Sequence, residues 1–247
     1  IDGVQNTFMV NHPAVTEAIV TFEYSPKVSV WVDSEAEYAA LLADPNVVVL
    51  QQDIPVPVNE NDVAPPAMAQ AVPWVDADLA HSLGYTGDGY VVAILDTGVD
   101  KNHYYLDSGK VVSEACYSTT NSGQDSASLC PGGAASSTAS GSALPYGTGV
   151  CDSGDCDHGT HVAGIAAGTH TGFSGIAPDA DVLAIQVFSA FTDNNYTYCA
   201  GSGYFDGTCA LTWNTDQELG LERVYALRST YDIASANMSI GGGTKQT

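Results

Sequence analysis

The sequence predicts an α/β protein: a doubly wound, mostly parallel sheet preceded by a small α/β module. Apolar runs typical of buried parallel strands, such as Tyr90–Leu95 and Val182–Val187, alternate with helical patterns in the later part of the chain. A strand–helix–strand pattern comes earlier, and a segment rich in proline, alanine and asparagine separates the two regions. These observations divide the chain into a module at residues 1–58, a linker at residues 59–73 and a larger domain at residues 74–247.

The module is predicted from three short elements. Residues 28–32 are β-formers and predict a strand, and residues 47–50 predict a second strand. Between them we expect a helix over residues 35–42, because Ser34 can cap its start and acidic residues fill its first turn. Residues 20–24 are a candidate for one more strand. Together these elements indicate a small α/β unit.

The larger domain follows in a regular order. Its predicted elements are a short helix at 76–83, a turn at 84–89, a strand at 90–95, a long Gly/Ser/Thr-rich stretch at 113–155, a helix from 158, a strand at 182–187, a helix at 214–229 and a last strand at 235–240. Strands that alternate with helices in this way build a doubly wound sheet.

The charge balance is strongly acidic. The chain has 29 Asp and Glu against 6 Lys and Arg, which gives a formal net charge of −23. Such a surface repels phosphate backbones, so nucleic-acid binding is excluded as a function. No run approaches the roughly 18 uninterrupted apolar residues that predict a membrane-spanning helix. We therefore expect neither a nucleic-acid partner nor a membrane.

Six cysteines fall in three local couples within loop-like segments rich in Gly, Ser, Thr or Asp. An even number in such loops favours disulfides and therefore an oxidising, extracellular compartment. Pairing between nearest neighbours is the favoured arrangement: Cys116 with Cys130, Cys151 with Cys156, and Cys199 with Cys209. The alternative is a zinc-type site, since cysteine and histidine are good zinc ligands. Its ligands would be Cys151, Cys156, His158 and His161.

A candidate catalytic acid ends the first buried strand of the larger domain. Asp96 follows the apolar run Val91–Leu95, at the carboxyl end of a predicted parallel strand, where open α/β sheets place their active sites. Gly98 lets the chain turn away immediately afterwards. The alternative is a plain turn, because Asp-x-Gly also follows many strands for conformational reasons alone.

A candidate catalytic histidine opens the next helix. The run from Asp157 to Gly168 begins with His158 and continues almost wholly in small residues. Small residues let a helix approach a sheet closely, which would hold His158 over the strand ends. A capping or surface histidine is the alternative for His158. We interpret His161 as a packed or hydrogen-bonded core histidine.

Four segments, in this order, resemble the subtilase family. The run Asp96-Thr-Gly98 and the run from His158 to Gly164 resemble its aspartate and histidine motifs. The segment from Gly175 to Val187 resembles the segment that follows them in the family, and Asn237 to Gly243 resembles its substrate-lining strand. The likeness covers most of residues 73–243. It implies a subtilisin-like fold and a serine endopeptidase.

The resemblance implies acyl transfer through an Asp-His-Ser triad. His158 would be the general base, and Asp96 would hold its tautomer. The family's nucleophile lies in a Gly-Thr-Ser-x-Ala motif that does not occur before Thr247. We therefore expect the serine beyond this sequence and the chain alone to be inactive. The alternative is a catalytically inactive binding module that keeps the cleft without the nucleophile.

The resemblance also implies how a polypeptide substrate binds. Ser239, Ile240 and Gly241 would pair with the substrate backbone as an added strand, so that specificity comes from pockets between alternate side chains. Two segments are candidates for the opposite edge of the cleft, residues 201–204 and residues 206–212.

Residues 15–58 resemble the inhibitory propeptide of the same family, and the run from Leu41 to Asp53 carries the likeness. This resemblance implies a ferredoxin-like propeptide module, a zymogen and a secreted protein. The carboxyl end of the propeptide, within residues 54–62, would lie along the substrate cleft as an inhibitor. The propeptide is therefore an expected partner in cis.

No cofactor is required for the implied chemistry, and a structural calcium ion stays an open question. The family often places an aspartate ligand where this chain has Tyr105, and the loop at residues 168–175 is short. Asp152, Asp155 and Asp157 could bind calcium or form a solvated turn.

Overall fold

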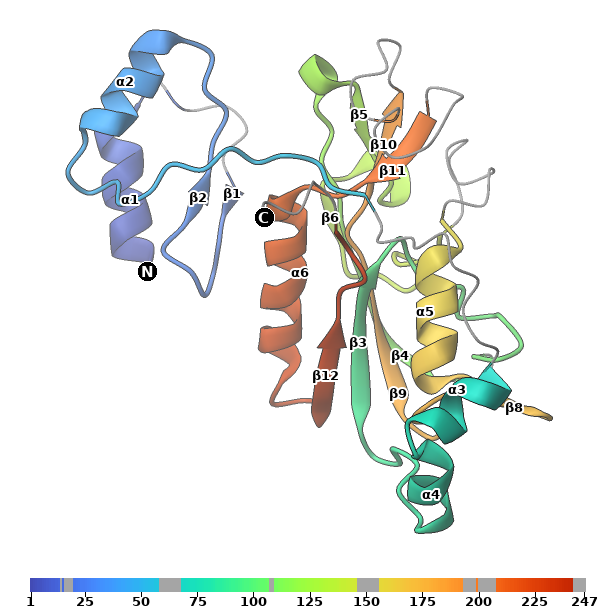
Figure 1. Ribbon diagram of the computed structural model, residues 1–247. Coiled ribbons are helices and arrows are strands. Elements are labelled where there is room, and N and C mark those ends of the chain that lie inside the picture. Colours follow the sequence, from blue (N-terminus) through green and yellow to red (C-terminus); the bar gives the residue numbers. More distant parts are fainter. Residues whose placement is uncertain are drawn as a thin grey trace. The chain divides into compact units, whose positions relative to one another are not determined.

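The computed structural model describes residues 1–13, 15, 20–57, 68–106, 109–145, 156–192, 199 and 208–241. The chain divides into two compact units, Ile1–Ile54 and Pro55–Thr247, whose elements are labelled in Figure 1. The predicted linker at residues 59–73 is described only in part. Residues 59–67 lie outside the described residues, and residues 68–73 belong to helix α3 (Met68–Trp74) instead.

The described residues of the first unit form two helices and one pair of short strands. These are α1 (Asp2–Asn11), β1 (Val20–Thr21), β2 (Val28–Ser29) and α2 (Glu35–Ala43), with β1 and β2 antiparallel. The prediction of α2 is confirmed, and the Ser34 hydroxyl accepts a hydrogen bond from the amide of Glu37 at 3.2 Å. The sequence patterns do not anticipate α1.

Two strand predictions in the first unit need correction. Residues 47–50 form no strand, and the side chains of Val48 and Val49 are 91% and 74% exposed. β-forming residues make a strand only where a neighbouring strand accepts their hydrogen bonds, and no described segment pairs with these residues. The strand predicted at 28–32 is limited to Val28–Ser29, the residues that pair with β1.

Gln5 ties α1 to the turn between β1 and β2. Its side-chain Nε2 donates to the carbonyl oxygens of Phe22, Ser25 and Lys27 at 2.8, 3.0 and 3.0 Å. The Gln5 side chain is buried, and Leu41 of α2 is buried in the same unit. A buried amide whose donors are all used holds the turn in one place.

A five-stranded sheet forms the centre of the second unit (Figure 1). Its order is β12 (Ile233–Asn237), β3 (Val91–Asp96), β9 (Asp181–Gln186), β4 (Val111–Tyr117) and β6 (Ser136–Ser137). Neighbouring strands are parallel except at the short edge strand β6, which is antiparallel to β4. The prediction of a mostly parallel α/β sheet is confirmed.

Helices cover both faces of this sheet (Figure 1). Successive side chains of a strand point to opposite faces, and β3 shows the consequence. Leu95 belongs to the core beneath α6 (Asn214–Leu227), whereas Ile94 belongs to the core beneath α5 (His158–Ala167). Gly220 lets α6 approach closely, because a Cβ there would lie 2.9 Å from Leu95 Cδ2. The sheet is therefore doubly wound.

A second, three-stranded antiparallel sheet continues from the carboxyl end of the main one. Its strands are β5 (Ser126–Ser128), β10 (Ser189–Thr192) and β11 (Thr208–Leu211), with β10 in the middle. Because β10 begins shortly after β9 ends, the same chain segment passes from one sheet into the other. We call this second sheet the platform.

Disulfides hold the platform. Cys116 of β4 is bonded to Cys130, which follows β5, and Cys199 is bonded to Cys209 of β11. Both are pairings between nearest neighbours. Cys156 is also disulfide-bonded, and its expected partner Cys151 lies outside the described residues.

The Gly/Ser/Thr-rich stretch at 113–155 contains more regular structure than its composition indicates. Strands β5 and β6 lie within it, β4 runs into it, and two 3₁₀ turns occur at Ser122–Gln124 and Pro131–Gly133. Serine and alanine are weak strand formers, so these strands depend on their partners: β5 pairs with β10, β6 with β4, and β4 with β9.

Two further elements complete the second unit: a helix close to the one predicted at 76–83, and a hairpin within residues 168–175, which the sequence analysis treats only as a short loop. The helix is α4 (Ala77–Ser82), and the hairpin consists of β7 (Thr169–His170) and β8 (Phe173–Ser174). The last strand, β12, lies earlier than predicted and ends at Asn237. Within the described part of the chain, no helix has both the length and the apolar character needed to cross a membrane.

Candidate active site

Asp96 is the last residue of β3, a strand with neighbours on both sides. Its side chain is fully buried, and the main-chain amide of Thr97 donates to Oδ1 at 2.7 Å. The other oxygen, Oδ2, is buried without a hydrogen-bond partner among the described residues. Burying an incompletely paired carboxylate is unfavourable for folding. Such a group therefore points to a role in function.

His158 opens α5 and lies against Asp96. Its ring nitrogen Nδ1 is 2.7 Å from Asp96 Oδ1. The His158 side chain is 14% exposed and that of Asp96 is 0% exposed, so the imidazole is the member of the pair that reaches the surface. A neutral imidazole that donates from Nδ1 has its lone pair on Nε2. That nitrogen can accept a proton from a hydroxyl group.

Two glycines allow the helix and the strand end to meet. A Cβ on Gly159 would lie 2.3 Å from the carbonyl oxygen of Gly98 and 2.9 Å from Cβ of Asp96. Gly98 has a φ of +106°, where only glycine is unstrained, and a Cβ there would lie 2.7 Å from the carbonyl oxygen of Ala143. The close approach expected from the small residues of α5 is confirmed.

Thr97 connects the two motifs. Its hydroxyl donates to the carbonyl oxygen of Cys156 at 2.9 Å and accepts from the amide of Gly159 at 3.0 Å. These partners flank His158, so one side chain fixes the backbone on both sides of the histidine. Sequence reasoning passes over Thr97. The available signal is a hydroxyl residue directly after a buried acid at a strand end.

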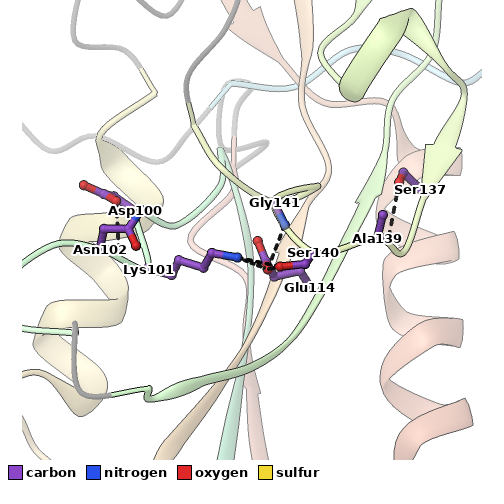
Figure 2. Close-up of polar contacts among 8 residues, drawn as sticks. All are labelled: Asp100, Lys101, Asn102, Glu114, Ser137, Ala139, Ser140 and Gly141. Atoms are coloured by element: carbon purple, nitrogen blue, oxygen red, sulfur yellow. Dashed lines mark hydrogen bonds and ion pairs between the residues drawn. The ribbon is translucent and has the colours of Figure 1, made fainter.

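The turn after Asp96 is braced from β4, as Figure 2 shows. The Lys101 ammonium lies 2.6 Å from Glu114 Oε2 and 2.9 Å from Ser140 Oγ. The amide of Gly141 donates to the same Glu114 oxygen at 2.9 Å. Because Glu114 is buried, it joins the turn, β4 and residues 139–141 into one support.

Two backbone edges hold the segment Pro55–Pro57. On one side, Val56 forms an antiparallel bridge with Thr212, and each donates to the other's carbonyl oxygen at 2.8 Å. On the other side, the amide of Gly241 donates to the carbonyl oxygen of Pro57 at 3.2 Å. The segment adds to the edge of the platform as a short strand would.

This arrangement bears on the predicted substrate-binding residues. Gly241 contacts the segment directly, and the Ser239 hydroxyl donates to Asn237 Oδ1 at 2.9 Å. Of the two candidates for the opposite edge, residues 206–212 contain Thr212, which pairs with Val56. Residues 201–204 lie outside the described residues. The sequence contains no clear signal for Thr212, because its role depends on pairing with a distant segment.

The interpretation of His161 as a core histidine is wrong. Its side chain is exposed, whereas Gly159, Ala163 and Ala167 are buried on the face of α5 that meets the sheet. His161 lies midway between Gly159 and Ala163 in the sequence. Two residues along a helix turn a side chain by roughly 200°, which places His161 on the side opposite to the buried face.

The zinc-type alternative is also contradicted. Cys156 is disulfide-bonded and His158 is paired with Asp96. Cys151, Asp152 and Asp155 lie outside the described residues. Among the residues that are described, no group of three or more His, Cys, Asp or Glu side chains is arranged to hold a metal ion.

Aromatic rings occupy the place where the family often has a calcium ligand. The Tyr105 ring lies 4.2 Å from that of Tyr104 and 5.7 Å from that of His170 on β7, measured between centroids. The amide of Thr169 also donates to the Tyr105 carbonyl oxygen at 3.0 Å. These contacts tie the segment after Asp96 to the β7–β8 hairpin.

The fold and the site resemble one class of protein. A buried aspartate at a parallel strand end, followed in the chain by a histidine at a helix start, is the order found in subtilisin-type serine proteases. Residues 87–202, which include both Asp96 and His158, match the subtilase family.

Curated relatives agree with this match. The chain is 30% identical over 217 residues to subtilisin E of Bacillus subtilis (strain 168), covering 85% of the chain and 43% of that protein. It is 31% identical over 180 residues to M-protease of Shouchella clausii (strain KSM-K16), covering 70% and 36%. It is 35% identical over 136 residues to the minor extracellular protease Vpr of Bacillus subtilis (strain 168), covering 55% and 14%.

The chain thus spans less than half the length of these relatives. The matches show that residues 87–202 are similar to the subtilase family and that the chain is similar to part of several subtilisin-type proteases.

Proposed function

We propose that the chain belongs to the zymogen of a secreted serine endopeptidase, in which Asp96 and His158 work with a serine that lies outside these 247 residues. The observation that carries the proposal is the 2.7 Å contact between His158 Nδ1 and the buried Asp96 carboxylate. A histidine with no function would not need to be held by a buried acid, by the Thr97 hydroxyl, and by two glycines at which any Cβ would clash with the neighbouring backbone.

The proposed mechanism is acyl transfer. His158 Nε2 takes the proton of the serine hydroxyl as the oxygen attacks the peptide carbonyl carbon, and then returns it to the leaving amine. Water completes the second half-reaction with the same base. Asp96 keeps the proton of the neutral ring on Nδ1 and stabilises the imidazolium that forms. Removing a triad member in this mechanism lowers turnover by roughly four to six orders of magnitude.

The first unit is proposed to act as an inhibitory propeptide in cis. The support is the segment Pro55–Pro57, which follows the first unit directly and pairs with Thr212 and Gly241. A polypeptide substrate that bound between these two edges would have to displace it. Ser239 and Ile240 are assigned to the same substrate-binding edge. Maturation is then expected to cut the chain just after the docked segment, in the part of the predicted range 54–62 that follows Pro57.

Secretion is part of the proposal. The two described disulfides brace the platform on which the segment lies, and such bonds persist in oxidising compartments. The printed name of one relative, the minor extracellular protease Vpr, agrees with this localisation.

The test is to express the full open reading frame and to assay casein cleavage with and without a serine-directed inhibitor. We expect inhibitor-sensitive cleavage, its loss in His158→Ala, and a new amino terminus just after the docked segment. His161→Ala is the matched control, because this residue lies on the exposed face of the same helix and should leave cleavage unchanged. A protein that binds peptides without cutting them would instead be the inactive binding module.

A further inference from the structure

Three main-chain hydrogen bonds hold the described residues of the segment Pro55–Pro57. Val56 uses both of its main-chain groups on Thr212, at 2.8 Å each. In an extended chain, the N–H and C=O of one residue point to the same side, and those of its neighbours point to the other side. The main-chain groups of residues 55 and 57 therefore face away from the platform.

Residue 57 faces the edge formed by Ser239, Ile240 and Gly241. Its carbonyl oxygen accepts from the amide of Gly241 at 3.2 Å. A main-chain N–H at the same residue would point toward a carbonyl oxygen of this edge and complete the pairing. Proline has no N–H. Residue 57 therefore makes one main-chain hydrogen bond to this edge, where most residue types would allow two.

We propose that Pro57 limits self-inhibition by withholding this hydrogen bond. The inference rests on the proposed function, since it assigns a regulatory role to the segment in the proposed substrate cleft. A substrate with any residue other than proline at this place makes the bond that the cis segment cannot make. The segment thus occupies the proposed substrate site while the chain is intact. Once the chain has been cut, substrate displaces the segment.

The effect is expected to be modest and measurable. A main-chain hydrogen bond at a partly exposed site changes an equilibrium by roughly three- to tenfold. Replacing proline also increases the conformational entropy of the undocked segment. This favours undocking and so opposes the effect of the new hydrogen bond. Pro55→Ala is the matched control, because it makes the same change two residues away at a residue with no hydrogen bond among the described residues.

The first experiment measures docking without any activity. In the full-length protein carrying His158→Ala, the segment stays attached, and amide hydrogen exchange reports how often it leaves the platform. We expect the Thr212 amide, which donates to Val56, to exchange roughly three- to tenfold more slowly in Pro57→Ala than in Pro55→Ala. The Ile94 amide in the main sheet checks that both variants are folded. Equal rates at Thr212, or faster exchange in Pro57→Ala, would overturn the proposal.

The second experiment follows the appearance of casein-cleaving activity after expression with His158 intact. Pro57→Ala should delay its appearance relative to Pro55→Ala by a similar factor. If casein-cleaving activity appears at equal rates in both variants, the proposed function is supported and the role of Pro57 is contradicted. A protein that cleaves nothing in any form loses the proposed function, while the exchange measurement still decides the role of Pro57 in docking.

Discussion

The corner where Asp96 meets His158 and the first unit are built from the same kinds of element but are held together differently. In the corner, backbone meets backbone, as where Gly159 lies against the carbonyl of Gly98. In the first unit, side chains make the connections: Gln5 reaches three carbonyl oxygens, and His12 Nε2 lies 2.8 Å from Asp44 Oδ2. Backbone contacts leave no room to adjust, whereas titratable side chains respond to the solution. We therefore expect the stability of the corner to depend on side-chain volume and the stability of the first unit to depend on pH.

The largest expected effect is at Gly159. In Gly159→Ala, the new methyl group would meet the Gly98 carbonyl oxygen at 2.3 Å, and neither backbone can move without displacing Asp96 or His158. We expect a loss of about 3 kcal/mol or more in the free energy of unfolding of the second unit. Denaturant unfolding of the full-length protein measures it.

Gly164→Ala is the control for that variant. Gly164 lies in the same helix, and a Cβ there would have nothing within 4 Å. Replacing a mid-helix glycine by alanine should then raise stability by about 0.5–1 kcal/mol. Equal losses in the two variants would show that helix propensity, and not close approach, governs this corner.

A smaller effect is expected at the brace behind the corner. Glu114→Gln removes the charge that pairs with Lys101, whose side chain is 26% exposed and therefore partly screened by water. We expect a loss of about 1–2 kcal/mol in the free energy of unfolding. Lys101→Met should cost more, because it leaves the buried carboxylate without its cation. The reverse order would contradict a role for this pair in holding the turn.

The smallest effect concerns the first unit and pH. The hydrogen bond from the amide of Asn46, followed by the interaction with His12, lowers the pKa of Asp44 below its usual range. A lowered folded-state pKa favours the carboxylate in the folded state. Its contribution to stability is present above the unfolded-state pKa and is lost as the pH falls through the folded-state value.

The first unit should therefore loosen below about pH 4. Amide exchange of Leu41 in the full-length protein, measured across the acid range, follows this change. In Asp44→Asn the dependence on acid should flatten, while exchange of Ile94 in the main sheet keeps its own profile. An unchanged acid profile in Asp44→Asn would assign the loosening to other groups.

Much of the second unit can be predicted from the sequence, because its central strands are apolar on both faces. Val91–Asp96 and Asp181–Gln186 lie almost where the apolar runs place them. Strand β5, with the sequence Ser-Ala-Ser, carries no such signal and depends on pairing with β10. The opposite error occurs at residues 47–50, where β-formers have no described partner.

The candidate site divides in the same way. Asp96 and His158 can be singled out because each lies in a local pattern of strand end or helix start. The roles of Thr97 and Thr212 cannot be predicted from the sequence, because their partners are distant in it. Thr97 binds the backbone of Cys156 and Gly159, and Thr212 pairs with Val56. His161 is misjudged because a single helical turn contains both buried and exposed positions.

The bond between Cys116 and Cys130 links a strand of the main sheet to the end of a platform strand. While it is intact, the edge at Thr212 and the carboxylate of Asp96 belong to one covalently braced frame. In a reducing cytosol that frame would be loose even with Asp96 and His158 in contact. For the secreted protein proposed above, export would also act as an assembly step, because the disulfide that fixes this frame would form only outside the cytosol.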